Sequence, residues 1–153
     1  MTTLTQNKLQ ELYEIDDYLW IEETIKLLKT KDLDKLDLDN LIEELEDLGK
    51  NNLNKVRSLL RQIIINILLL QYWEQEYDRN SRHWEGEIIA FRDDINNSVT
   101  TTLRNKLNEE LDHIYHVAMK LVSTKTGLSS QLFPANCPYS LDKLLNDNWY
   151  PKK

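Results

Sequence analysis

The scarcity of glycine and proline is the feature that most constrains what this chain can fold into. Its 153 residues include Gly 3 and Pro 3, whereas average usage would give roughly eleven glycines and eight prolines. Sandwiches and barrels need many tight turns, which draw on both residues. The composition therefore argues against an all-β fold and against a glycine-rich phosphate-binding α/β fold, and it favours long helices with few breaks.

Apolar residues recur at helical spacing in four segments, which predicts four main helices. The second segment crosses Gly49, and we expect its helix to be nearly continuous there, since the spacing resumes at Val56. The stripes expected to face the core are Ile21, Ile25 and Leu28; Leu41, Leu45 and Leu48, continued by Val56, Leu60, Ile63, Ile67 and Leu70; Trp84, Ile88, Phe91 and Ile95; and Leu103, Leu107, Leu111, Ile114, Ala118 and Leu121.

Helix-capping residues predict several boundaries. Asp16 or Asp17 caps the first helix, Asn80 or Ser81 the third, and Gly127 ends the fourth. Residues 128–153 hold all three prolines and are expected to wrap over the helices as extended chain, with one short helix capped by Ser140.

These patterns predict an all-α fold: a four-helix, mostly antiparallel bundle with an extended C-terminal wrap and one short helix. Residues 1–15 are expected to form a flexible N-terminal segment, because they are polar with scattered leucines. Residues 16–153 are expected to form a single helical-bundle domain.

The charge balance limits the classes of partner. Net charge is −7, and residues 1–50 hold 14 acidic and 6 basic residues, a net of −8, whereas the remainder is close to neutral. Duplex DNA is an unfavourable partner for such a chain, because phosphate binding needs a basic surface. No signal peptide is apparent, and the apolar run of residues 63–70 is too short to span a bilayer. We therefore expect a cytoplasmic protein that is not inserted in a membrane.

Cys137 is the single cysteine, which excludes an intramolecular disulfide and a zinc site of the CxxC type. We interpret its side chain as part of the packing. No cofactor is predicted.

Aromatic and basic residues alternate around residues 73–84, at an expected connection between helices. We call Trp73, Arg79, Arg82, Trp84 and the downstream Arg92 the aromatic–arginine patch. Arginines near a helix N-terminus can hold a phosphate or carboxylate, and aromatic rings can stack on a base or cover an apolar ligand. The alternative is that the tryptophans are core and the arginines pair with neighbouring acids.

Gly86 lies beside this patch within the third helix. A glycine at such a position could let another backbone or a ligand approach closely.

Glu43 and Glu46 lie one helical turn apart in an acidic run. Paired carboxylates can share a divalent metal if a second helix supplies more of them, and residues 93–94 and 109–110 are available. The alternative is a solvated helix face. Glu110 and His113, and His113 and His116, also have spacings found in metal sites, but these motifs are incomplete and no metal is predicted.

An ordered series of motifs along residues 11–151 resembles the bacterial family called domain of unknown function twenty-nine. The resemblance rests on residues 17–20 (DYLW), 36–49 (LDLDNLIEELEDLG), 79–84 (RNSRHW) with Arg92, 126–128 (TGL), 133–134 (FP) and 137–145 (CPYSLDKLL). It implies a compact all-α fold and no established activity.

The function predicted is therefore that of a small cytoplasmic protein-interaction or regulatory module with an unidentified protein partner. The sequence favours a non-enzymatic role over an enzymatic one, because it contains no complete set of catalytic motifs. One alternative is a metal-dependent hydrolase or nuclease built on Glu43 and Glu46. Another is an RNA or single-strand nucleic-acid accessory protein that binds through the aromatic–arginine patch. The sequence leaves the oligomeric state open.

Overall fold

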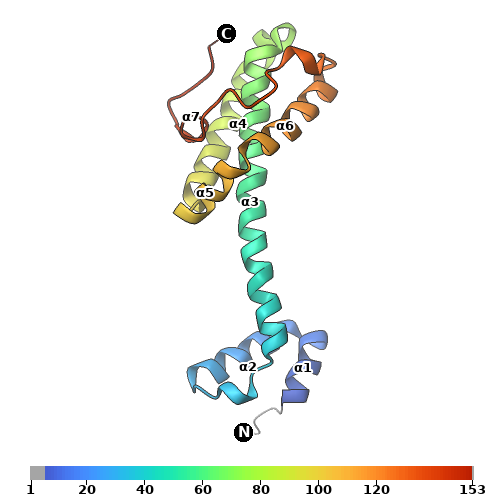
Figure 1. The fold of residues 1–153 in the computed structure, drawn as a ribbon, viewed down its shortest axis with the longest axis vertical. Coiled ribbons are helices and arrows are strands. Elements are labelled where there is room, and N and C mark those ends of the chain that lie inside the picture. The colour runs from blue at the N-terminus through green and yellow to red at the C-terminus, as the bar shows by residue number, and fades with distance from the viewer. Residues whose placement is uncertain (1–5, 153) are drawn as a thin grey trace. The chain divides into compact units, whose positions relative to one another are not determined.

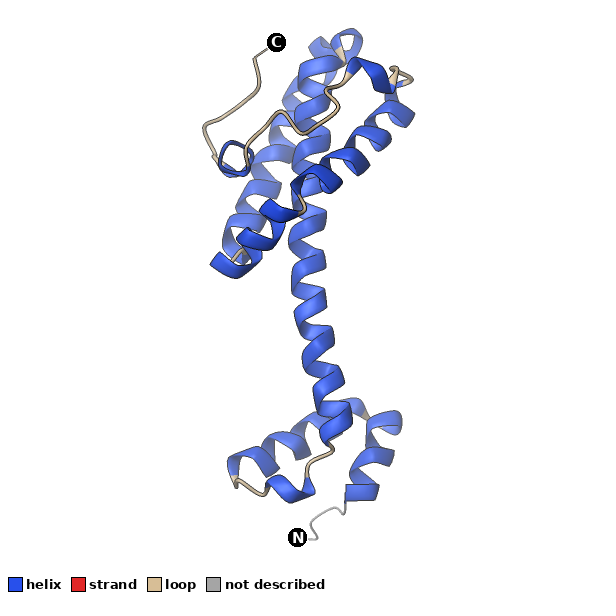
Figure 2. Cartoon of the chain, in the orientation of Figure 1, coloured by secondary structure: helices blue, strands red, loops and turns tan. Residues whose placement is uncertain are grey.

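The structure, a computed structural model, describes residues 6–152, and these residues form helices and loops with no strand (Figures 1 and 2). The all-α prediction is confirmed. The chain divides into two compact units, of which the first ends at Asn51 and the second begins at Asn52. We describe each unit by itself.

The first unit contains α1 (Gln6–Ile15), α2 (Asp17–Lys29), the 3-10 turn η1 (Leu33–Lys35) and the beginning of α3 (Leu38–Tyr72). Residues 6–15, which we expected in a flexible segment, form α1, and Leu9 is buried. Residues 1–5 of that segment lie outside the described residues.

Trp20 lies in the buried core of the first unit. Its ring meets that of Tyr13 edge-on, with centroids 5.0 Å apart, and its indole N–H donates to the Asp37 carboxylate at 3.1 Å. Asn40 donates to the same carboxylate oxygen at 2.7 Å. Asp37 is buried, so these hydrogen bonds offset part of the cost of taking its carboxylate out of water.

The boundaries of α2 follow from local hydrogen bonds. The side chain of Asp16 accepts from the backbone N–H of Leu19, which confirms the predicted cap. At the other end, Lys31 has a positive φ of 58°, and the N–H groups of residues 31 and 32 return to the carbonyls of residues 28 and 27. This is a Schellman ending, with lysine at a position usually taken by glycine.

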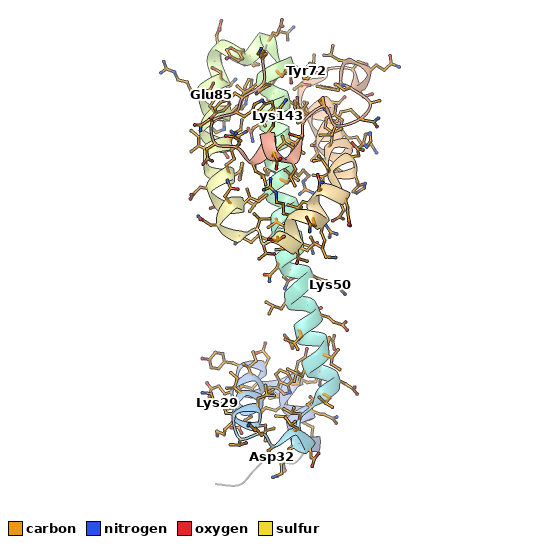
Figure 3. The ribbon with its side chains drawn as sticks, turned by 60° about the vertical axis from the view of Figure 1, so that its left-hand side comes forward. Lys29, Asp32, Lys50, Tyr72, Glu85 and Lys143 are labelled. Atoms are coloured by element: carbon orange, nitrogen blue, oxygen red, sulfur yellow. The ribbon has the colours of Figure 1, made fainter. Side chains whose placement is uncertain are left out.

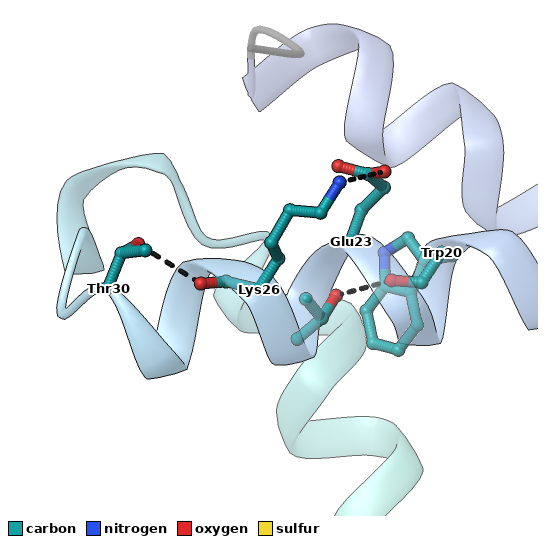
Figure 4. A network of polar contacts seen from close by, with 5 residues as sticks. Trp20, Glu23, Lys26 and Thr30 are labelled. Atoms are coloured by element: carbon teal, nitrogen blue, oxygen red, sulfur yellow. Dashed lines mark hydrogen bonds and ion pairs between the residues drawn. The ribbon is translucent and has the colours of Figure 1, made fainter. Parts of the chain in front are cut away.

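Polar side chains of α2 bond within their own helix. Thr24 donates to the Trp20 carbonyl at 2.7 Å, Lys26 reaches Glu23 at 3.3 Å, and Thr30 donates to the Lys26 carbonyl at 3.0 Å (Figure 4). These groups therefore tie no other element to α2.

α3 is continuous across Gly49, as predicted. From Val56 onward most of its apolar side chains are buried in the core of the second unit, and the others are partly buried against it. Within this unit the later part of α3 lies between α4 (Tyr77–Ser98) and α6 (Leu111–Thr126) (Figures 1 and 3). The predicted four-helix arrangement is not confirmed, because the first of the four expected helices, α2, belongs to the first unit.

Two predicted boundaries differ in the second unit. α4 begins at Tyr77, directly after the 3-10 turn η2 (Glu74–Glu76), so neither Asn80 nor Ser81 is its cap; the Asn80 amide instead donates back to Glu76. The expected fourth helix is interrupted at Glu110, where α5 (Thr101–Glu109) ends and α6 begins.

The C-terminal segment is held to the helices by many hydrogen bonds. It contains η3 (Ser130–Leu132) and α7 (Leu141–Leu145), and Ser140 caps α7 as predicted. The hydroxyl of Tyr115 donates to the Pro134 carbonyl at 2.7 Å, and the Asp112 carboxylate accepts from the N–H of Cys137 at 3.0 Å. In Figure 3, Lys143 marks α7 and Tyr72 the end of α3.

Gly127 ends α6 in the left-handed conformation, with φ 78°, as its position in the sequence predicts. No helix in the described part of the chain is both long and apolar enough to cross a membrane.

Candidate interaction surfaces

The two tryptophans of the aromatic–arginine patch face the core of the second unit. Trp84 is buried and Trp73 is half-buried. Their rings stack with centroids 5.8 Å apart and planes at 21°. They therefore stabilise the turn between α3 and α4 and leave little ring surface for a base or another ligand.

Arg92 is also buried, at 0% exposure. Its Nε donates to the Leu144 carbonyl at 2.8 Å and its Nη2 to the Lys143 carbonyl at 3.3 Å, while the guanidinium lies 5.3 Å from the centre of the Tyr150 ring. Burial lowers the pKa of this guanidinium. Arg92 thus joins α4 to α7, and its geometry is that of a structural anchor.

Arg79 and Arg82 lie on the surface, near the start of α4. Neither forms an ion pair with any of the residues that the structure describes. The pairing with neighbouring acids that we considered for them is therefore absent. Of the five residues in the patch, these two are the ones whose charged groups are available to a partner.

Glu43 and Glu46 are exposed on α3. Their neighbour Glu44 accepts a hydrogen bond from the Tyr13 hydroxyl at 2.6 Å, and this contact raises the pKa of the Tyr13 phenol. Within residues 6–152, no three acidic, histidine or cysteine side chains come together in a way that could hold a metal ion. The arrangement is that of an acidic helix face.

The residues with metal-site spacing around Glu110 and His116 are also engaged elsewhere. Glu110 receives two hydrogen bonds from Arg57, at 2.6 and 3.1 Å, and the His116 ring contacts the Ala135 carbonyl at 2.6 Å. His113 is exposed at the edge of a small hollow of about 110 Å³, lined also by Arg57 and Arg61. This volume is well below the roughly 300 Å³ at which small-molecule pockets begin.

A larger hollow, of about 480 Å³, lies beside α4 and is lined by Ile89, Ala90, Asp93, Asp147 and Tyr150. Arg79 and Arg82 are not among its lining residues. Of the groups named from the sequence it carries Asp93, one of the carboxylates considered for a metal site, but neither Glu43 nor Glu46.

The first unit leaves an unusual number of large apolar side chains in water. Among its described residues, the buried core consists of Leu9, Trp20, Leu27 and Leu36. In the described part of the same unit, eleven large apolar residues are exposed: Ile15, Tyr18, Leu19, Ile21, Ile25, Leu28, Leu33, Leu38, Ile42, Leu45 and Leu48. The described part of the much larger second unit exposes Ile89, Leu121 and Leu132.

This finding corrects two of the predicted core stripes, and Leu121, the last residue of the fourth stripe, is exposed as well. Ile21, Ile25 and Leu28 were expected to face the core, but α2 buries Trp20, Thr24 and Leu27 on a neighbouring face. Likewise, Leu45 and Leu48 of α3 are exposed, and only Leu41 packs against the small core.

The sequence contained a signal for this surface. α2 has apolar residues on two adjacent faces, more than one neighbouring helix can cover. We interpreted the more regular of the two faces as core, and the structure buries the one that carries Trp20.

Four of the exposed side chains form one row along α3. Leu38, Ile42, Leu45 and Leu48, which we call the α3 stripe, follow one another at helical spacing. They are bordered by acids, since Leu38, Ile42 and Leu45 are followed directly by Asp39, Glu43 and Glu46, respectively, all of them exposed. The α3 stripe is thus an apolar ridge with a parallel row of carboxylates about 100° around the helix.

The fold and its surfaces define a small all-helical protein with an incompletely covered first unit. Its described residues include no cluster of side chains that could hold a metal ion. The family described as "Domain of unknown function DUF29" matches residues 12–150, nearly the whole chain, and the chain belongs to that family. The resemblance drawn from the motifs is therefore confirmed. No curated protein and no solved structure matches the chain significantly.

Proposed function

We propose that this chain is a protein-interaction module and that the first unit carries its principal contact surface. The observation that carries the proposal is the excess of exposed over buried large apolar side chains in that unit. Large exposed apolar surface marks interaction sites in proteins. A unit that ends at Asn51 and has four buried core side chains among its described residues is also marginal by itself, so a partner that covers it would add to its stability.

The alternatives have less support from the described residues. Hydrolysis assisted by a metal requires carboxylates that converge, and Glu43 and Glu46 have no third ligand beside them. Single-strand recognition through stacking requires accessible rings, and Trp84 is buried beneath Trp73. The cytoplasmic location remains part of the proposal and rests on the acidic, single-cysteine composition.

The test is affinity capture from native lysate with the full chain and two single variants. Leu45→Gln changes a side chain that is 60% exposed on the α3 stripe, and Ile89→Gln, at 61% exposure in the second unit, is the matched control. We expect a protein retained by the unmodified chain and by Ile89→Gln to be lost with Leu45→Gln. Equal retention by all three would contradict a contact surface on the first unit.

A further inference from the structure

The α3 stripe has the dimensions of a site for one helix. From Leu38 to Leu48 it runs for about 15 Å, or three helical turns. A partner helix that binds an apolar face presents anchors at i, i+3 or i+4, and i+7, and so needs a surface of about this length. The side chains are already exposed in place on a regular helix, so no rearrangement of α3 is needed.

Charge decides which partner fits. The row of Asp39, Glu43 and Glu46 lies along the stripe, and residues 1–50 have a net charge of −8. A helix that places its apolar side chains on the stripe brings its flanking residues next to these carboxylates. Basic flanks are attracted there, whereas acidic flanks are repelled.

The same charges disfavour other occupants. A second copy of this chain would bring together two first units that each carry a net negative charge, and like charges oppose association. An anionic membrane and a nucleic acid are both repelled by a surface of net negative charge. A basic amphipathic helix is the occupant that satisfies both the apolar stripe and its acidic border.

We infer that the α3 stripe binds a basic amphipathic helix of a partner protein, with Leu38, Ile42 and Leu45 in contact with its apolar face and Asp39, Glu43 and Glu46 with its lysines or arginines. This inference rests on the proposed function and specifies the chemistry of the partner.

The experiment uses two fluorescent peptides of about 18 residues, long enough to cover the stripe. Both carry leucines at helical spacing; the remaining positions are lysine in one (the Leu/Lys peptide) and glutamate in the other (the Leu/Glu peptide). Binding to the full chain is measured by fluorescence anisotropy. We expect the Leu/Lys peptide to bind at least about tenfold more tightly than the Leu/Glu peptide, and less tightly as salt is raised.

Variants locate the binding. Leu45→Gln and, separately, Ile42→Gln should each lower the affinity for the Leu/Lys peptide about tenfold, whereas Ile89→Gln should leave this affinity unchanged. Glu43→Lys combined with Glu46→Lys should abolish the preference for lysine. Glu74→Lys combined with Glu109→Lys changes two exposed acids of the second unit by the same total charge and should largely preserve the preference.

Three results would overturn the inference: absent or equal binding of the two peptides, equal effects of Leu45→Gln and Ile89→Gln, or self-association of the chain that Leu45→Gln abolishes. Binding to anionic vesicles that depends on Leu45 would assign the stripe to a membrane instead. If native capture still depends on Leu45 while the peptides bind equally, the interaction module stands and the assignment of a basic helix fails.

Discussion

Arg92 shows how a residue chosen as a binding candidate can serve the fold. An arginine that follows an aromatic and basic segment is compatible with ligand binding, but the guanidinium of Arg92, inside α4, is fully buried and donates to the carbonyls of Lys143 and Leu144. Both acceptors lie about fifty residues further along the chain, beyond the reach of local sequence patterns. Only the folded chain shows that Arg92 anchors α7.

Replacing Arg92 should therefore destabilise the second unit. Arg92→Met keeps a long side chain but removes both hydrogen bonds, and we expect the free energy of unfolding to fall by about 2–3 kcal/mol in urea denaturation. Arg104 offers the control, since it pairs with Asp142 of α7 at the surface, and Arg104→Met should cost less than about 1 kcal/mol. Equal losses would contradict the anchoring role of Arg92.

The buried tyrosines predict a loss of stability in alkali. Burial raises the pKa of Tyr115 from its ordinary value of 10.0 to about 12 and also raises that of Tyr139. The unfolded chain therefore releases these protons first as pH rises. Stability is unaffected by them below pH 10 and declines as pH rises from about 10 through 12.

Tyr115→Phe should make this alkaline decline shallower. At neutral pH the same variant should lose about 1 kcal/mol, because the hydroxyl no longer donates to the Pro134 carbonyl. The measurement is the free energy of unfolding in urea between pH 7 and 12, with Tyr18→Phe at an exposed site as the control for loss of a surface phenol. An unchanged slope for Tyr115→Phe would show that its proton is not linked to folding.

At the scale of elements, the sequence predicted several helices and their caps but not which faces are buried. Asp16, Gly127 and Ser140 act at helix ends through contacts within a few residues, so local chemistry is sufficient to predict them. Burial of Ile21 or Leu45 depends on whether another element covers that face, and periodicity is the same in both cases. The exposed first-unit surface was therefore misinterpreted as core for a physical reason.

Gly49 and Gly86 allow a test of helix continuity. Both lie inside long helices, α3 and α4, and a Cβ added at either would meet nothing within 4 Å. Alanine restricts the unfolded chain and favours the helix. We expect Gly49→Ala and Gly86→Ala each to raise the free energy of unfolding by about 0.5–1 kcal/mol in urea denaturation.

If Gly86→Ala raises the free energy of unfolding and leaves the capture of partner protein from native lysate unchanged, the hypothesis that this glycine admits a close approach of another backbone is contradicted. A gain in stability accompanied by lost capture would support that hypothesis. A loss of stability at Gly49 would indicate that α3 is not a continuous helix at this point.

At the scale of the whole molecule, the two candidate surfaces lie on different units and have opposite charge. The α3 stripe is apolar with an acidic border, whereas Arg79 and Arg82 present two cations at the start of α4 that form no ion pair with a described residue. The order of aromatic and basic residues along the sequence was sufficient to identify the aromatic–arginine patch as a candidate site. Its division into the buried Trp84 and Arg92 and the accessible Arg79 and Arg82 depends on how the second unit packs.

Arg79→Ala and Arg82→Ala, separately and combined, should weaken capture of any acidic partner of the second unit without unfolding it. Because both side chains are exposed and form no ion pair with a described residue, each change should alter the free energy of unfolding by less than about 0.5 kcal/mol. The measurement is capture from native lysate beside circular dichroism. Full retention by the double variant, in a chain whose Leu45→Gln form loses its partner, would place the binding of that partner on the first unit, because Leu45 belongs to the first unit and Arg79 and Arg82 belong to the second.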